Sequence, residues 1–484
     1  MKEQKDDGDK IKFILRAIIL LEILGIASVS FVLSSGLAAL VIGNTGTIST
    51  KQVTAPTGHP ADIQAAVNTV IAAGGGTVYI PAGDWRCDQA TNGAIQINLE
   101  PLPTGAWLNI VGSYANVTTT QQNGISISCP ATILRSQKIV DASTSTYLYT
   151  FTVGGSDGGP GLNFAGSIGK HVRISGITIL GNVQDEGGST TNIGIGLGQV
   201  DGYLIDHCLI DGFTGAGIDT YQSKGVISNC VITDYYHLGL GSESSPYGIW
   251  GYGVAVHGNS AIGGYGTPTW INNLTKIIGK YVWQGITLDY SNPNSGSMAT
   301  TGTTNNISFT AGPVYIENNG FEWCRHAISS NQYGYYVARY NYFGQSLMGY
   351  QQTDVHGYGY PSGRGAEFYN NYFTPATTAI WFRGGGGVFF NNTIDDTGRG
   401  SASGVYLTTA DGGSQSNLQW PNDIWVWSNT FVNVAIPLRV DAGINAGTNY
   451  YTDSMGGTVT PTNPTPPRPG YASYTYPHPL TSGS

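Results

Sequence analysis

The chain has 484 residues, of which 70 are glycine and only 11% are charged, against about 25% in an average soluble protein. This composition excludes a coiled coil, a helical bundle and a charge-driven disordered chain, and it is typical of a turn-rich β protein. The net charge is −9 and no basic cluster follows residue 16, so we expect no nucleic acid among the partners.

The first 43 residues have the pattern of a targeting segment. Residues 1–16 carry five basic side chains, and the apolar run at 17–43 is interrupted only by Glu22. The uncharged part from residue 23 onward is long enough to cross a bilayer as a helix. An uncleaved membrane anchor and a cleaved signal segment both fit, and a buried core helix is a third alternative. The first two would place the chain from about residue 45 outside the cytoplasm, anchored at the cell surface or secreted.

A helical segment follows. Asp62 is a candidate N-cap, and glycines 74–76 would end the helix before a strand at 77–80. Apolar residues three or four positions apart would form its buried face: Ile63, Ala66, Val67, Val70 and Ile71. We expect this helix to cover the open end of a repeat structure, because a first repeat would otherwise expose its core.

The body of the chain repeats a short pattern of aliphatic, variable, asparagine or small, variable and aliphatic residues. Its copies end at Ile179, Ile210, Ile232, Phe321, Phe343, Phe373, Ile394 and Phe431. The shortest intervals are close to 22 residues, and the 89 residues between Ile232 and Phe321 are close to four such steps. A period of this length predicts a solenoid. Asparagines at equivalent positions could also hydrogen-bond along a ladder, and these are Asn341, Asn371, Asn392 and Asn429.

The segment Ala61–Trp85, ADIQAAVNTVIAAGGGTVYIPAGDW, resembles the opening of the pectate-lyase-like superfamily. The resemblance implies an all-β fold: a single-stranded right-handed parallel β-helix (a pectin-lyase-like solenoid). The N-terminal capping helix and the one hydrophobic membrane segment predicted above would precede it. We expect a cytoplasmic N-terminus at 1–16, the anchor or signal segment at 17–43, the β-helix at 45–455 and a Pro/Thr-rich C-terminal strap at 456–484. Members of this superfamily are extracellular and commonly act on polysaccharides, so a polysaccharide is the expected partner, besides a membrane bound through the N-terminal segment.

A second repeated pattern, a small residue, an aliphatic residue and a polar residue two or three positions later, predicts equivalent strands. If these strands stack, their last residues form one column on a single face: Asp289, Asn331, His356, Arg383, Thr408 and Arg439. A column of acid, histidine and arginine suits an acidic or neutral glycan, because arginine binds carboxylates in a bidentate manner.

Chemically active residues are densest between 325 and 383. As candidate catalytic residues we take His356, Asp354, Arg383, Arg325, His326 and Glu367, because acids and histidine can transfer protons. As candidate substrate-binding residues we take Arg339, Arg364, Asn331, Asp289, Tyr358 and Trp381, because aromatic faces stack on sugars and arginines bind acidic groups. The alternative is structural, since Arg and Glu on adjacent coils can pair and tyrosine ladders can stiffen a solenoid.

Reaction signatures narrow the choice. Gly217–Thr220 resembles a polygalacturonase motif, but Ala216 stands where that family needs an Asp, so the hydrolase mechanism is poorly matched. Leu204–Cys208 resembles a pectate lyase segment whose Asp helps to hold calcium, which makes Asp206 a candidate Ca²⁺ ligand, with a turn-capping role as the alternative. Asp185 and Glu186 are a weaker candidate pair. We identify no definite metal site or cofactor.

The five cysteines are too few for a disulfide scaffold in an exported chain of this size, and Cys208 and Cys230 occupy equivalent repeat positions as stacked small residues. Taken together, the sequence favours an exported or surface-anchored enzyme that degrades polysaccharide, with a lyase ahead of a hydrolase. The alternative is a non-catalytic protein of the cell surface that binds glycan or serves a structural role.

Overall fold

The computed structural model describes residues 51–90, 93–120, 126–137, 147–154, 170–181, 191–198, 200–213, 215–221, 223–233, 252–257, 281–283, 286–288, 313–331, 335–346, 351–356, 365–375, 377–400, 402–409, 420–455 and 459–481. The predicted segments 1–16 and 17–43 lie outside these ranges. Within them, no helix has the length and apolar character needed to cross a membrane.

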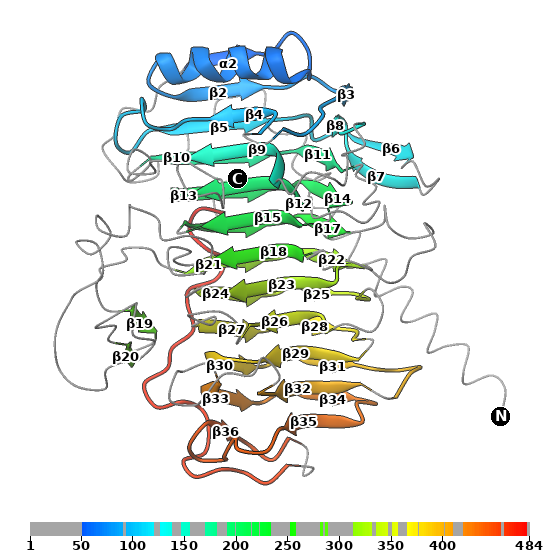
Figure 1. Ribbon diagram of the computed structural model, residues 1–484, viewed down its shortest axis with the longest axis vertical. Helices are drawn as coiled ribbons and strands as arrows, with labels where there is room; N and C mark the ends of the chain where they lie inside the picture. The colour runs from blue at the N-terminus through cyan, green and yellow to red at the C-terminus, as the bar shows by residue number, and fades with distance from the viewer. Residues whose placement is uncertain are drawn as a thin grey trace.

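The described chain winds through three long sheets, here called A, B and C, in which every pairing between neighbouring strands is parallel (Figure 1). Each turn of the chain, here called a coil, adds one strand to each sheet. This arrangement is a parallel β-helix and confirms the solenoid predicted from the repeats. Its expected right-handed sense is the one that parallel crossovers adopt almost without exception.

Sheet A has twelve strands: β1 (Gln52–Thr54), β2 (Gly76–Tyr79), β5 (Trp107–Val111), β10 (His171–Ser175), β13 (Asp201–Asp206), β16 (Lys224–Ser228), β21 (Val314–Glu317), β24 (Tyr335–Arg339), β27 (Gly365–Tyr369), β30 (Gly385–Phe390), β33 (Pro421–Trp427) and β36 (Tyr450–Thr452). Sheet B has ten: β3 (Gly83–Arg86), β8 (Thr132–Arg135), β11 (Ile177–Leu180), β14 (Leu209–Asp211), β17 (Val231–Thr233), β22 (Gly320–Glu322), β25 (Tyr342–Phe343), β28 (Tyr372–Phe373), β31 (Thr393–Asp395) and β34 (Thr430–Val432).

Sheet C also has ten strands: β4 (Ile95–Ile97), β9 (Tyr147–Gly154), β12 (Thr191–Gly198), β15 (Ala216–Tyr221), β18 (Tyr252–His257), β23 (His326–Asn331), β26 (Thr353–Val355), β29 (Thr378–Phe382), β32 (Ser403–Leu407) and β35 (Ile436–Val440). Two antiparallel hairpins stand outside the three sheets: β6 (Asn116–Thr120) with β7 (Ser126–Pro130), and β19 (Tyr281–Trp283) with β20 (Ile286–Leu288).

The single helix of the described chain, α2 (Pro60–Ala72), covers the N-terminal end of the solenoid, as predicted (Figure 1). All five predicted apolar residues of its inner face are buried in the main core. Its start differs from the prediction, because the N-cap is His59 and Pro60 opens the helix. Asp62 lies in the first turn instead, where its carboxylate accepts a hydrogen bond from the Thr57 hydroxyl and complements the helix dipole.

The aliphatic and aromatic residues that end each repeat copy point into the core from sheet B, and all of them except Phe431 are buried. One interval was misjudged. Ile232 and Phe321 are direct partners on the neighbouring strands β17 and β22, so the 89 residues between them make one coil with long insertions, not four coils.

The predicted asparagine ladder is present and has one more member, Asn319. Each side-chain amide donates to the side-chain oxygen of the next asparagine, over distances of 3.2, 3.0, 2.9 and 3.1 Å from Asn319 to Asn429. Each also donates to a main-chain carbonyl, for example Asn341 to Ile316 at 2.8 Å. The left-handed residue of each turn is the one before the ladder position, such as Asn370 with φ 58°. The ladder therefore ties together the turns between sheets A and B.

The C-terminal strap runs back along the outer face of sheet A (red in Figure 1). Tyr474 bonds to the Tyr335 hydroxyl at 2.8 Å, and Tyr476 stacks on Tyr340 with ring centroids 3.7 Å apart. These contacts dock the aromatic part of the strap on the solenoid.

Candidate functional site

The outward face of sheet C carries a buried carboxylate that three basic side chains approach. Asp354 lies in β26 between the core residues Thr353 and Val355, so strand alternation directs its side chain away from the core. Its side chain is fully buried. Arg383 donates to it through Nε at 2.8 Å and through Nη2, and Nε2 of His356 lies 2.9 Å from Oδ2. Burial by itself would raise the pKa of Asp354, but the nearby His356 and Arg383 hold it well below its usual range.

His356 and Arg383 form the accessible part of this group, with 19% and 13% of their side chains exposed. Asp354 accepts a hydrogen bond from Nε2 of His356, and Nη2 of Arg383 lies 2.8 Å from Nδ1 of the same ring. Because a guanidinium can only donate, this geometry fits a neutral imidazole with its proton on Nε2. Nδ1 is then the ring nitrogen that can accept a proton. A negatively charged ligand that bound Arg383 would draw it away from Nδ1 of His356. Nδ1 would then be available to accept a proton.

His326 closes the inner side of the group. Its Nδ1 lies 2.9 Å from the Gln351 carbonyl, its Nε2 lies 3.7 Å from Asp354, and its ring stacks on Tyr252 at 5.4 Å. Burial lowers the pKa of His326 to about 4, against the opposing effect of Asp354; the charge of Arg325 lowers it further. Since Asp354 is already satisfied by Arg383 and His356, we regard His326 as neutral at physiological pH and as a positioning residue.

Tyr252 extends the group. Its hydroxyl lies 3.5 Å from Nε2 of His356, and burial, with the nearby Asp354, raises its pKa to about 12. It therefore stays protonated at neutral pH and can donate a proton. Tyr252 was not singled out in the sequence because it lies one residue before the repeated motif, which its strand β18 carries at 253–257.

Aromatic side chains continue this face toward the C-terminal end. Trp381 is the strand neighbour of Asp354, and its ring packs edge-on against Tyr406 at 5.4 Å. The Arg383 guanidinium lies 5.7 Å from the Trp381 ring, and that of Arg439 lies 4.3 Å from the Tyr406 ring. In the described part of the chain, the buried Trp381 Nε1 has no hydrogen-bond acceptor. This face combines flat rings with two guanidinium groups.

The predicted column is largely present. Asn331, His356, Arg383 and Thr408 occupy equivalent positions, because each of the last three donates its main-chain N–H to the strand before it. Arg439 does not belong to this column. It is the direct partner of Tyr406, and Asp441 takes the predicted place after Thr408. A slip of two residues preserves the inward and outward alternation, which is why the motif did not reveal it.

Two predicted site residues lie on a different face. Glu367 and Arg339 belong to sheet A, beneath the strap, and both side chains are buried. Glu367 accepts from the hydroxyls of Tyr335 and Tyr471 at 2.7 and 2.9 Å, and Arg339 donates to Glu317. The structure therefore does not bring them to the Asp354 group, and their partners are those of the structural alternative.

The remaining predicted residues divide into two groups. Arg325 precedes β23 beside His326 and is half-buried. Asp289, Tyr358 and Arg364 lie outside the described residues, and for Asn331 only its strand position is described.

Calcium has no fitting site in the described part of the chain. Both carboxylate oxygens of Asp206 are engaged, by Arg173 at 2.8 and 2.6 Å and by His207 at 2.7 Å. Because both oxygens are already engaged by side-chain nitrogens, the predicted Ca²⁺ role of Asp206 is not supported. Asp185 and Glu186 lie outside the described ranges, and within those ranges no three acidic, histidine or cysteine side chains gather as metal ligands.

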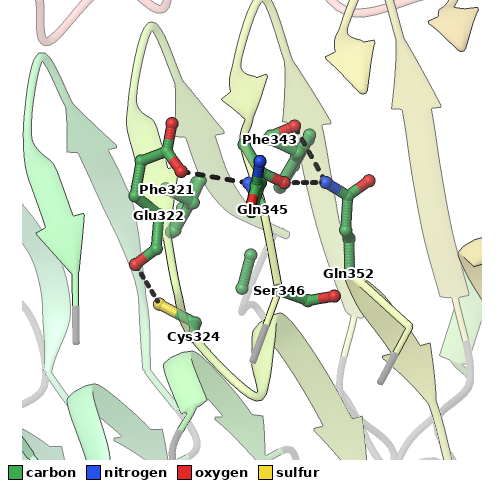
Figure 2. Close-up of a pocket in the computed structure, with 9 residues that line it drawn as sticks. Phe321, Glu322, Cys324, Phe343, Gln345, Ser346 and Gln352 are labelled. Atoms are coloured by element: carbon green, nitrogen blue, oxygen red, sulfur yellow. Dashed lines mark hydrogen bonds between the residues drawn. The ribbon is translucent and has the colours of Figure 1, made fainter. Parts of the chain in front are cut away.

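Figure 2 shows a small pocket at the corner between sheets B and C. The polar groups that line this pocket hydrogen-bond to one another. Glu322 accepts from the Gln345 N–H at 3.0 Å, and the Gln352 amide donates to the carbonyls of Phe343 at 2.9 Å and of Gly344. These bonds fix the start of β26, where the neighbouring Gln351 carbonyl meets His326. The pocket thus supports the Asp354 group from behind.

No protein-family model matches the sequence, and no curated protein sequence matches it. Among solved structures, the A-module of mannuronan C-5 epimerase AlgE4 from Azotobacter vinelandii is 13% identical, with 81% of this chain and 95% of that chain covered and a TM-score of 0.34. A mutant tailspike protein of E. coli bacteriophage HK620 is 11% identical, with 82% and 63% covered and a TM-score of 0.43. A mannuronic acid specific polysaccharide family 6 lyase from human gut microbiota is 14% identical, with 83% and 79% covered and a TM-score of 0.40.

All three are parallel β-helix proteins, the fold that the three sheets of this chain show independently. At these identities and scores, the similarities leave the reaction and the substrate of this chain open.

Proposed function

We propose that the outward face of sheet C binds an acidic polysaccharide and that Asp354, His356 and Arg383 act in its cleavage by β-elimination. The observation that carries this proposal is that a histidine and an arginine, both partly exposed, are held together over one buried carboxylate. Elimination from a uronate needs a base and a cation that neutralises the sugar carboxylate, and these two residue types provide them.

In this mechanism the uronate carboxylate binds Arg383, which weakens the contact between Arg383 and Nδ1 of His356. Nδ1 then takes the proton from C5 of the sugar. The electron pair of that C–H bond forms the C4–C5 double bond, the C4–O bond breaks, and the leaving oxygen receives a proton from the Tyr252 hydroxyl. Asp354 keeps the ring oriented and stabilises the imidazolium that forms.

Trp381 and Tyr406 extend the proposed binding surface, because flat aromatic rings stack on the faces of sugars. A polymer that lies across several coils would contact both rings. Their alignment along one sheet favours a chain substrate over a small molecule.

We further infer that the protein acts outside the cytoplasm, either exported or anchored at the cell surface through residues 17–43. Support comes from the basic residues followed by an apolar run. Protease added to intact cells should digest the region after residue 45 if this location is right. Protection of that region in intact cells, with digestion only after lysis, would exclude it.

The decisive test is a panel of uronate-containing and neutral polysaccharides, incubated with the full chain in mild detergent, with calcium or with a chelator. Ultraviolet absorbance of unsaturated uronate and new reducing ends are both measured. We expect absorbance to rise for the parent and for His478→Ala, a control at a histidine of the strap itself, and to be lost in His356→Ala. Reducing ends without absorbance would indicate hydrolysis and exclude elimination.

A second candidate function is glycan binding without catalysis. It is favoured by the complete burial of Asp354 and by the mutual pairing of the three polar side chains, which would also stabilise a binding surface. Retention of the parent on one polysaccharide, with neither absorbance nor reducing ends produced, would select this function.

A further inference from the structure

Sheet A carries a second group with the same three residue types as the Asp354 group. Arg173 in β10 donates to Asp206 through Nε at 2.8 Å and through Nη2 at 2.6 Å, and Nδ1 of His207 lies 2.7 Å from the same Oδ2. The donor atoms of the two arginines match, and in both groups the histidine approaches Oδ2. As with Asp354, the carboxylate of Asp206 is almost fully buried, whereas the two basic side chains reach the surface.

The two groups differ in how the histidine is turned. His356 uses Nε2 toward its aspartate and Nδ1 toward its arginine, so both ring nitrogens are engaged. His207 uses Nδ1 toward Asp206, and in the described part of the chain its Nε2 has no partner. Tyr114 packs edge-on against the His207 ring at 5.8 Å and is itself bonded to Ser175 at 2.7 Å. The imidazole of His207 is therefore fixed, with Nε2 left for another molecule.

The cation beside it also has unused capacity. A guanidinium has five N–H groups, and within the described ranges the two side-chain hydrogen bonds of Arg173 both go to Asp206. Asp206 remains ionised, because the hydrogen bonds from Arg173 and His207 hold its pKa below the usual value although burial opposes this. The group thus keeps a fixed arginine and a fixed histidine at the surface.

Arg173 and His207 are partly exposed, with 23% and 25% of their side chains accessible. Asp206, Ser228 and Glu317 are direct partners on the successive strands β13, β16 and β21. The described strap follows sheet A up to Glu317, which accepts from the His478 N–H and from the Thr481 hydroxyl. Its last described contacts therefore stop two strands short of Asp206.

We propose that Arg173 and His207 form a second binding site, on sheet A, for a sugar acid: a carboxylate bound by Arg173 beside a hydroxyl that donates to Nε2 of His207. Both groups occur together in a uronic acid residue. The choice of a uronic acid rests on the proposed function, whereas the site itself needs no cleavage. The site would hold an acidic polymer on sheet A, whereas the proposed cleavage takes place on sheet C.

The test uses the full chain labelled with ¹³C-histidine in detergent and follows the imidazole signals by NMR. The probe is monomeric galacturonate, which has no glycosidic bond at C4 to eliminate, and galactose is the neutral control. The His207 signal is identified as the one missing in His207→Asn. Asparagine is the matched choice, because Asn229 takes the equivalent left-handed position in the next coil.

We expect the His207 signal to shift with galacturonate, to saturate, and not to move with galactose. Arg173→Lys keeps a positive charge beside Asp206 but loses the planar fork, and it should weaken the apparent affinity about tenfold. A His207 signal that does not move, or that moves equally with galactose, overturns the site. The His356 signal in the same spectra reports on sheet C, so failure of the proposed function and failure of this site are seen separately.

Discussion

The guanidinium of Arg339 and the carboxylate of Glu317 lie on adjacent strands of sheet A, 2.8 Å apart, and neither side chain is exposed. The strap completes their enclosure, since Arg339 also donates to the Tyr474 carbonyl at 2.9 Å. A buried ion pair of this kind is costly to break on one side only, because the other charge is left without compensation.

We therefore expect Arg339→Met to lower the free energy of unfolding by about 3 to 5 kcal/mol, measured by denaturant titration. Cleavage of polysaccharide at permissive temperature should stay close to that of the parent, because Arg339 lies on sheet A and the proposed site lies on sheet C. The double variant Arg339→Met/Glu317→Leu removes both charges and should recover much of the loss. A large fall in activity with unchanged stability would return Arg339 to the role of a substrate ligand.

Stability should also depend on pH through His326. Burial lowers the pKa of this histidine to about 4 in the folded protein, whereas the unfolded chain binds the proton near its usual value of about 6.5. The contribution is therefore complete above about pH 6.5 and is lost as the pH falls toward 4, by up to about 3 kcal/mol. Unfolding of the parent and of His326→Gln across this range should show a smaller slope in the variant. Equal slopes would mean that His326 is not held neutral.

Asp354 acts in a lower window. Its folded pKa lies below the usual value of 3.8, so its contribution is present above that value and is lost as the pH falls through the folded pKa. Loss of stability from this carboxylate should therefore begin only below about pH 4, after the change due to His326 is largely complete. Asp354→Asn should remove this second phase and leave the first in place.

Arg383→Lys should impair catalysis more than folding. Lysine keeps the positive charge beside Asp354, but it cannot donate in parallel to both carboxylate oxygens and also contact the His356 ring. Displacement of these groups should lower the initial rate of uronate cleavage about 100-fold, read by absorbance. Arg399→Lys is the control, because the Arg399 side chain donates to the Pro375 carbonyl, which is not part of the Asp354 group. Equal rates in both variants would contradict the role given to Arg383.

The cysteine at position 230 offers a test of the ladder. Its main-chain N–H bonds to the Asn319 side-chain oxygen, and its thiol points at the Ile205 carbonyl, the place where an asparagine amide donates in later coils. Cys230→Asn should lengthen the ladder by one step and raise the free energy of unfolding by about 1 kcal/mol. Cys230→Ser, which lacks the amide, should not, and destabilisation by the Asn variant would show that the coil has no room for it.

Local sequence patterns predicted correctly the features that depend on residues close together in the chain or at equivalent repeat positions. The inner face of α2 follows from the spacing of its apolar residues, and the ladder follows from asparagines at equivalent positions. The number of coils between Ile232 and Phe321 could not be obtained from the length of that interval. An insertion within one coil lengthens the sequence in the same way as additional coils do. Only strand pairing distinguishes them.

Closeness in sequence was a poor guide to the site. Glu367 lies between Asp354 and Arg383 in the chain, yet it faces the strap, because a single coil visits three sheets in about 22 residues. Tyr252 and Tyr406 were not predicted as site residues, although they lie on the same face as the Asp354 group. Tyrosine is common in this chain, and neither residue sits in a motif that marks it, although the fold brings both to the proposed surface.

The strap changes how this solenoid can come apart. In a stacked array each coil touches only its neighbours, so disorder can spread from an end one unit at a time. Here a single segment bonds to Glu367 through Tyr471, to Tyr335 through Tyr474 and to Glu317 through Thr481. The last coils can therefore unfold only if the strap also loses its contacts with coils nearer the N-terminus. Unfolding at this end thus becomes a cooperative event that involves several coils.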